Sequence, residues 1–292
     1  MTDYENVDFR QVLADLKEKT ATDSIVLKPY VGSPDDTDSK FGGAPYMPKD
    51  FDYPTTADGQ NLKLLAQLNF EQLPPLKNFP TKGILQFFVL SSEDLIGVDF
   101  DNPTKQDKFR VIYYSEILPK SERRQDLSAM TMADDEYAPV QAELALDGQI
   151  ETSFVRSEDY RFEQMSDVDI GEAFSQLIKR RNEAGPGEEF ERLDDKVAEL
   201  DEILEEYETE TEIGKGHRIG GWPGFTQSDP RGYAKDDLKR FDTLLFQMDS
   251  DWAEDESFDI MWGDMGVANF FINAEDLRNL NFENVLYNWD CG

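Results

Sequence analysis

The sequence predicts an α+β protein: two similar β-rich units from an internal duplication, packed about a pseudo-twofold axis, with additional helices. The first observation is that residues 40–115 and 218–292 hold short runs of β-branched and aromatic residues, bounded by Gly and Pro. The second is that motifs of the first stretch recur in the same order about 180 residues later. The third is that apolar residues elsewhere recur at helical spacing.

Five short motifs carry the repeat. The sequence Gly-Gly-x-Pro occurs at residues 42–45 and again at residues 220–223. The other matched pairs are residues 64–67 with 244–247, Gly83 and Phe87-Phe88 with Gly266 and Phe270-Phe271, residues 92–95 with 274–277, and residues 111–113 with 285–287. Because the order is kept, we interpret the two stretches as a duplicated unit. Two copies are too few for a solenoid, so we expect two similar sheets.

The chain before and within the first unit alternates between helix and strand signals. Residues 5–19 place Val7, Phe9, Val12, Leu13 and Leu16 on one side of a helical wheel, which predicts an amphipathic helix. Residues 24–31 are typical of a strand, and Pro29 confines it to an edge or an end. Residues 62–70, 83–90 and 111–114 are predicted strands of the first unit.

The segment from residue 116 to residue 217 is predicted to be a connecting segment that contains helices. Residues 168–182 form one expected helix, which Gly185-Pro186-Gly187 ends. From Leu193 to Tyr207 the apolar residues recur in steps of four and three, so a second helix has a narrow apolar stripe and a very acidic outer face. A partner helix could dock on this stripe, but we expect it to pack within its own domain. The predicted division is therefore 1–39, 40–115, 116–217 and 218–292.

Composition limits the function more than any single motif. Lys and Arg number 29 and Asp and Glu 62, so the 292-residue chain carries a formal net charge of −33. Such a field repels nucleic acid and anionic membranes and favours cationic partners. One cysteine, Cys291, excludes an intramolecular disulfide, and the polar amino end has no pattern of a secretory signal. We therefore expect a soluble cytoplasmic protein.

The stretch from Gly216 to Gly232 concentrates the unusual residues. His217, the one histidine, could act as a base or ligand, or form an anion cradle with Arg218 and the amides of Gly220 and Gly221. In the alternative, His217 braces the turn into the second unit and Arg218 forms a salt bridge. Trp222 could line a ligand pocket or belong to the core.

Further polar residues follow in the second unit. Gln227, Asp229 and Arg231 lie in a Pro-containing turn, where Arg231 could grip an anion or pair with an acid such as Asp229. Asp249 and Asp251 are spaced to share one strand face and could form a two-carboxylate metal site or remain solvated.

The sequence has no phosphate-binding loop, no nucleophile elbow, no dinucleotide-binding pattern and no paired-cysteine motif. We therefore expect no cofactor.

The same residues resemble the YwqG-like family of bacterial proteins, a domain of unknown function. The resemblance extends over most of residues 25–290 and rests on residues 42–45, 65–69, 83–88, 217–223, 227–231, 245–251 and 261–264. It implies a cytoplasmic α+β protein and no settled activity.

Two functions follow as hypotheses. The first is a non-catalytic binding protein with an acidic surface, whose contact site involves the second unit and whose partner is a basic protein. The second is a hydrolase or transferase for a small anionic substrate, with Arg218 and Arg231 holding the anion and His217 as the base.

Overall fold

The computed structural model describes residues 4–127, 137–211, 216–233 and 237–292. They divide into two compact units. We call the first the helical unit, and its described residues are 4–22, 152–211 and 222–224. We call the second the sheet unit, and it contains the remaining described residues.

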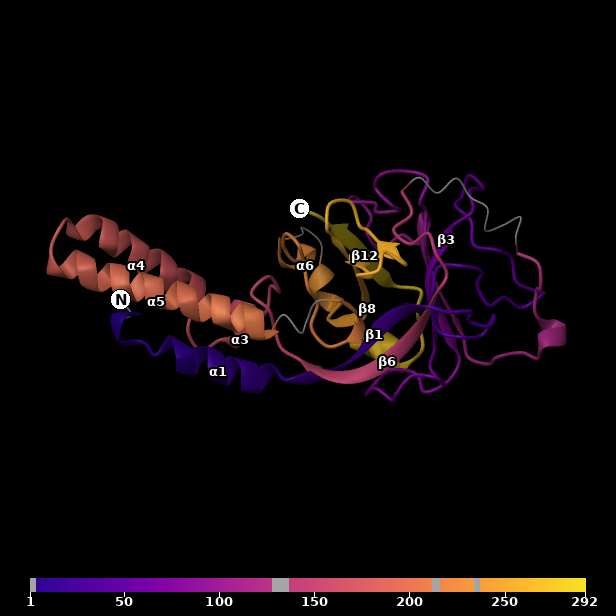
Figure 1. Cartoon of the computed structure of the whole chain (residues 1–292), viewed down its shortest axis with the longest axis horizontal. Helices are drawn as coiled ribbons and strands as arrows, with labels where there is room; N and C mark the ends of the chain where they lie inside the picture. Colours follow the sequence, from indigo (N-terminus) through magenta and orange to yellow (C-terminus); the bar gives the residue numbers. More distant parts are fainter. Residues whose placement is uncertain (1–3, 128–136, 212–215, 234–236) are drawn as a thin grey trace. The chain divides into compact units, whose positions relative to one another are not determined.

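The helical unit contains three long helices that lie side by side (Figure 1). Its elements are the 3₁₀ turn η1 (Tyr4–Asn6), α1 (Phe9–Thr20), α3 (Phe162–Met165), α4 (Ile170–Ala184) and α5 (Glu188–Thr211). Asp8 and Asp169 begin α1 and α4 by accepting hydrogen bonds from backbone amides of the first turn. Gly185, with a φ of +67°, ends α4. The three predicted helices are confirmed as α1, α4 and α5. The acidic helix α5 extends beyond both ends of the predicted apolar stripe, which runs from Leu193 to Tyr207.

The core of the helical unit is formed by the apolar faces that the sequence predicts for its helices. α4 buries Ile170 and Leu177, while α5 buries Leu193, Val197 and Leu200. Each such side chain contributes about 1.5–3 kcal/mol when it is fully removed from water. The charged residues of α5 are therefore left on the outer face of this unit.

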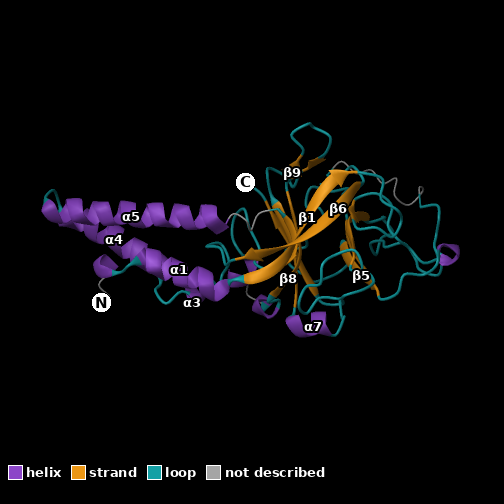
Figure 2. Ribbon diagram, turned by 60° about the horizontal axis from the view of Figure 1, so that its bottom comes forward, coloured by secondary structure: helices purple, strands orange, loops and turns teal. Residues whose placement is uncertain are grey.

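The sheet unit is built on a large antiparallel sheet (Figure 2). Its strands are β1 (Thr22–Val31), β2 (Lys40–Phe41), β3 (Lys63–Asn69), β4 (Ile84–Val89), β5 (Phe109–Tyr114), β6 (Leu144–Ser153), β7 (His217–Gly220), β8 (Thr243–Asp249), β11 (Val267–Ile272) and β12 (Val285–Asp290). Smaller elements are η2 (Lys120–Glu122), α6 (Pro230–Tyr233), η4 (Leu238–Arg240), α7 (Ala274–Arg278) and the two-stranded pair of β9 (Asp251–Trp252) with β10 (Asp259–Ile260).

The strand order corrects one expectation. In the described part of the chain the order is β12-β11-β8-β7-β1-β6-β2-β3-β4-β5, so the two β-rich stretches join one ten-stranded sheet and not two separate sheets. β1 and β6 connect them, because β1 pairs with β7 and β6 pairs with β2. We call β2 to β5 the first arm, and β7, β8, β11 and β12 the second arm. The structure is therefore α+β, as predicted, with a continuous sheet.

The two arms have matching registers. In the first, β3 pairs with β4 from Lys63 opposite Val89 to Asn69 opposite Ile84, with Leu65 as an extra residue. In the second, β8 pairs with β11 from Thr243 opposite Ile272 to Asp249 opposite Val267, with Leu245 as the extra residue. Each arm therefore carries a bulge at the same point of its second strand.

The core of the sheet unit is rich in aromatic rings from both arms. Phe87 of the first arm lies with its ring centroid 4.6 Å from that of Phe246 in the second. Phe270 stacks on Tyr287 at 4.5 Å. These residues are fully or almost fully buried, so the interior of the sheet unit is packed with side chains.

Candidate functional site

The Gly-rich stretch begins as a strand and then leaves the sheet. Residues His217–Gly220 form β7, and all four are buried. Gly220, the last residue of β7, and Gly221 after it have φ values of 67° and 71°, and Gly42 and Gly43 after β2 have similar values of 62° and 70°. A Cβ on Gly42 would lie 2.3 Å from the carbonyl oxygen of Ala142, so this position requires glycine for space as well as conformation. The glycines thus turn the chain away from both arms.

His217 is held between a backbone amide of β8 and a carboxylate of β9. Its side chain is 2% exposed, its Nδ1 accepts a hydrogen bond from the Asp249 amide at 3.2 Å, and its Nε2 lies 3.3 Å from Oδ2 of Asp251. Because Nδ1 accepts a hydrogen bond, the neutral ring carries its proton on Nε2. Through this N–H the ring donates a hydrogen bond to the Asp251 carboxylate. The ring also meets Phe41 edge-on, with centroids 4.8 Å apart. These contacts hold the imidazole in one orientation.

Asp249 and Asp251 both contact His217, Asp249 through its backbone amide and Asp251 through its carboxylate, but they lie on different strands. Asp249 ends β8, and its carboxylate accepts from the amides of Gly216 and Ser250 at 2.8 and 2.9 Å. Asp251 begins β9, and its hydrogen bond with His217 holds the pKa of its carboxyl below the ordinary value. Among the described residues, no three His, Cys, Asp or Glu side chains are grouped so as to hold a metal ion.

Arg218 lies in the interior of the sheet unit. Its backbone pairs with Val26 on one side and Gln247 on the other, and the residue is fully buried. Gln247 donates from Nε2 to the carbonyl oxygen of Gly216 at 2.7 Å, which ties the start of β7 to β8. Arg218 therefore does not lie at the surface that a small anion would approach.

Arg231 forms a buried ion pair with Asp229. Its Nε donates to Oδ1 of Asp229 at 2.9 Å and its NH2 group to Oδ2 at 2.6 Å, and both side chains are almost fully buried. The guanidinium also donates to the carbonyl of Phe241 and lies over the Phe271 ring, 4.0 Å from its centroid. This is the ion-pair alternative that the sequence leaves open.

Gln227 joins the same loop to the end of β12. Its backbone amide donates to Oδ2 of Asp290 at 2.7 Å, and its side-chain amide donates to the carbonyl of Cys291 at 2.8 Å. Burial raises the pKa of the Asp290 carboxyl, although these and neighbouring amides act in the opposite direction.

Trp222 belongs to the helical unit, unlike the other predicted site residues. Its indole Nε1 donates to the carbonyl of Thr20 at 2.7 Å, and its backbone amide donates to the hydroxyl of Ser153 at 3.1 Å. The guanidinium of Arg161 lies over its ring, 4.3 Å from the centroid. The indole is therefore occupied by packing and hydrogen bonds within the helical unit.

The structure thus brings the predicted residues together in small sets. His217, Asp249 and Asp251 meet at one end of β8, and Asp229 meets Arg231 beside β11. Each set is engaged internally by hydrogen bonds or an ion pair.

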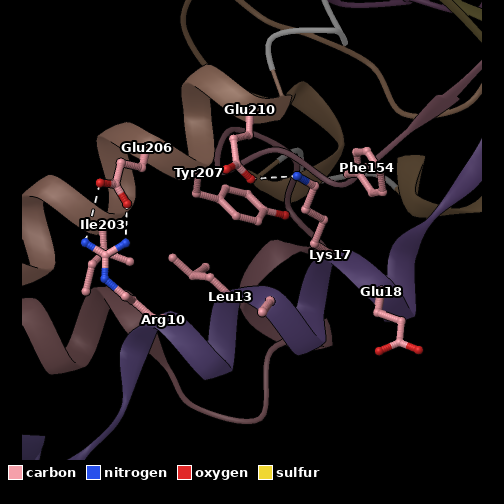
Figure 3. A pocket seen from close by; sticks show the side chains of 10 residues that line it. Arg10, Leu13, Lys17, Glu18, Phe154, Ile203, Glu206, Tyr207 and Glu210 are labelled. Atoms are coloured by element: carbon pink, nitrogen blue, oxygen red, sulfur yellow. Dashed lines mark hydrogen bonds and ion pairs between the residues drawn. The ribbon is translucent and has the colours of Figure 1, made fainter.

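The helical unit has an open groove that none of the predicted site residues lines. It has a volume of about 490 Å³ and lies between α1 and α5, with Phe154 at one end (Figure 3). α1 contributes Arg10, Leu13, Ala14, Lys17 and Glu18, and α5 contributes Ile203, Glu206, Tyr207 and Glu210. The one available sequence signal is a pair of bases, Arg10 and Lys17, seven residues apart on a helix face.

The groove has an apolar floor and an ionic rim. Leu13, Ile203 and the Tyr207 ring form the floor, and burial raises the pKa of the Tyr207 hydroxyl. That hydroxyl donates to the carbonyl of Val155 at 2.7 Å. Across the rim, Arg10 pairs with Glu206, and Lys17 Nζ lies 2.6 Å from Oε2 of Glu210 (Figure 3).

The described helices include none with both the length and the apolar character that crossing a bilayer requires.

These features define an α+β protein with a ten-stranded antiparallel sheet among the described residues. The model of one family, described as a domain of unknown function (DUF1963), matches residues 39–291, and the chain belongs to this family. No curated protein matches the chain.

Proposed function

We propose that this chain is a non-catalytic, YwqG-like member of its family that binds a basic protein partner in the cytoplasm through its acidic surface. The observation that carries the proposal is the composition of α5, where twelve Asp and Glu residues face two Lys and Arg residues. Because the apolar stripe of α5 is buried, most of these carboxylates stay at the surface of the helical unit. Such a surface attracts cationic partners and speeds their encounter.

The internal engagement of the catalytic candidates favours binding over catalysis. A general base has to reach the proton of a substrate, and a group that grips an anion has to present its donors to solvent. His217 is 2% exposed and Arg231 is 1% exposed, and both are committed to carboxylates of the chain. In this proposal both residues stabilise the second arm.

We further propose that the two arms descend from one duplicated unit. Equivalent hydrogen bonds support this: Gln67 Nε2 donates to the Asp38 carbonyl at 2.8 Å, and Gln247 Nε2 donates to the Gly216 carbonyl at 2.7 Å. The registers also place Val111 opposite Phe87 and Tyr287 opposite Phe270. Val111 is then equivalent to Tyr287, whereas the sequence comparison matched Val111 with Val285.

The proposed copies differ in charge where they connect their second and third strands. Between residues 70 and 83 the first arm has one acid and two lysines. Between residues 250 and 266 the second arm has six acids and no base, together with Trp252, which is 53% exposed. In the proposal, this acidic connection is a secondary contact for the same basic partner.

Titration with a labelled Lys-rich peptide tests the function. We expect binding that weakens steeply as NaCl rises from about 0.05 M to about 0.5 M, because salt screens exposed charges. The test variant removes four exposed acids of α5 by Glu191→Gln, Asp195→Asn, Asp201→Asn and Glu205→Gln. It should weaken binding by about tenfold, which corresponds to about 1.4 kcal/mol.

A matched variant controls for net charge alone. It neutralises four exposed acids of the sheet unit by Asp50→Asn, Asp52→Asn, Asp101→Asn and Glu116→Gln. This variant should keep most of the affinity. Equal losses in the two variants, or no binding at low salt, would contradict a contact surface on α5.

A further inference from the structure

We infer that the groove between α1 and α5 receives one amphipathic helix of a partner protein, with Lys or Arg on the flanks of that helix. The inference rests on the proposed function, because it specifies which part of a basic partner the helical unit holds. The occupant is therefore a helix of a cationic protein, and its apolar face enters the groove.

The two walls of the groove have the spacing of a helix face. On α1, the lining residues Arg10, Leu13, Ala14 and Lys17 fall at i, i+3, i+4 and i+7. On α5, the lining residues Ile203, Glu206, Tyr207 and Glu210 repeat this spacing. Because residues at this spacing lie above one another along a helix, the groove runs along both helices. A third helix can follow the same direction and pack its side chains between the two walls.

The middle of the groove provides both room and apolar contact. Ala14 is exposed there and ends at Cβ, so it leaves space above the buried Leu13 and Ile203. The volume of about 490 Å³ lies within the range of about 300–1,000 Å³ that is usual for ligand sites. Phe154, which is partly buried, closes one end and adds an aromatic surface.

The rim selects the charge of the occupant. The side chains of Glu206 and Glu210 are 48% and 62% exposed, and exposed ion pairs contribute little because water competes for both charges. Cations on a partner helix can therefore replace Arg10 and Lys17 as partners of these carboxylates. With twelve acids and two bases on α5, a cationic helix is favoured, whereas a second copy of this chain carries a net charge of −33 and is repelled.

The test uses the full chain and a labelled synthetic helix with Leu at i, i+3, i+4 and i+7 and Lys on both flanks. A control peptide has the same composition with the Leu positions scrambled. Ala14→Trp fills the middle of the groove and should weaken binding of the amphipathic peptide by about tenfold or more in fluorescence anisotropy. Gln11→Trp, at an exposed position of α1 outside the groove, should leave the affinity and the melting temperature unchanged.

The outcomes separate this inference from the proposed function. Equal binding of the scrambled peptide, or wild-type affinity in Ala14→Trp, would overturn the groove as the site and leave charge-led binding intact. Binding of neither peptide at low salt would overturn both. If Ala14→Trp lowers the melting temperature, amide chemical shifts of the wild-type chain decide. Changes centred on Ala14 and Glu206 support the inference, and changes confined to other residues overturn it.

Discussion

Two separate constraints, backbone conformation and space, require glycine at position 42, directly after β2. Gly42 has a φ of +62°, and a Cβ there would meet the Ala142 carbonyl oxygen at 2.3 Å. Gly59 has a φ of +89° with no atom within 4 Å of the same construction. Both positions lie in the sheet unit and have positive φ, but only Gly42 lacks room for a Cβ. A comparison of the two therefore distinguishes the cost of backbone strain from the cost of steric overlap.

We predict that Gly42→Ala destabilises the sheet unit far more than Gly59→Ala. The left-handed conformation alone costs about 1–2 kcal/mol for a residue with a Cβ. A clash with backbone adds to this, so Gly42→Ala should lower the free energy of unfolding by about 3 kcal/mol or more. Urea unfolding with a probe in the sheet unit measures both. Equal losses would show that the Ala142 contact is easily relieved.

The His217–Asp251 hydrogen bond predicts a pH dependence at the acid end. The pKa of Asp251 is lower in the folded chain than its ordinary value of 3.8, so the contribution is fully present above that value and is lost as pH falls through the folded pKa. Asp251→Asn should therefore reduce stability by less than about 1 kcal/mol at neutral pH, because the carboxylate is partly exposed, and by less still below about pH 3. Urea unfolding from neutral to acid pH measures the difference.

A double-mutant cycle provides the control for this prediction. Once Asp251→Asn is present, His217→Ala should no longer change stability through the hydrogen bond to the Asp251 carboxylate. A loss from Asp251→Asn that is constant from neutral to acid pH would assign the effect to packing and not to charge.

The side-chain amide of Gln67 in β3 binds the chain both before and after β2. Gln67 accepts from the Tyr46 amide at 2.6 Å and donates to the Asp38 carbonyl at 2.8 Å, and it is fully buried. Gln86 also donates to it from the neighbouring strand at 2.8 Å. Gln67 therefore connects β3 to the segments on both sides of β2, and Gln86 adds a hydrogen bond to the Tyr46 carbonyl.

We predict that Gln67→Leu destabilises the sheet unit by about 2–5 kcal/mol, because buried donors and acceptors lose their partners. Gln149→Leu, at an exposed position of β6, is the matched control and should change stability by no more than about 0.5 kcal/mol. Hydrogen exchange at the Tyr46 amide gives a local measurement. Unchanged protection there in Gln67→Leu would contradict the assigned role.

Local periodicity predicted most elements, but strand pairing required contacts distant in the sequence. The three long helices and the strands β3, β4, β5, β8, β11 and β12 follow from local sequence patterns, whereas β2 and β7 were not predicted as strands. β6 was not recognised because Asp147-Gly148 in its middle is typical of a turn. The structure shows another reason for this glycine: a Cβ there would lie 2.5 Å from Cδ2 of Leu73.

The same distinction applies to the candidate sites. The polar residues around His217 could be named, but their meeting depends on the pairing of β7 with β8. The groove depends on contact between α1 and α5, although β1 to β6, α3 and α4 lie between them in the sequence. No local pattern encodes that neighbourhood.

The charge of the entire chain predicts a response to salt. With a net charge of −33, the folded state is opposed by repulsion among its own carboxylates. We predict that the melting temperature rises by a few degrees between about 0.02 M and about 0.5 M NaCl, because the screening length shortens. The α5 variant with four neutralised acids should show a smaller rise. A melting temperature that falls or stays constant would indicate that the repulsion is already relieved in the folded state.

The placement of β1 in the middle of the sheet bears on how the chain is made. Leu27 pairs with His217, so a ribosome must add about 190 further residues before β1 meets β7, which takes roughly 10 to 40 s at usual elongation rates. β2 to β6 are synthesised first, so β1 can join β6 and complete half of the sheet early. The other edge of β1 then waits for β7, and this nascent half-sheet is the form in which chaperones would meet the protein.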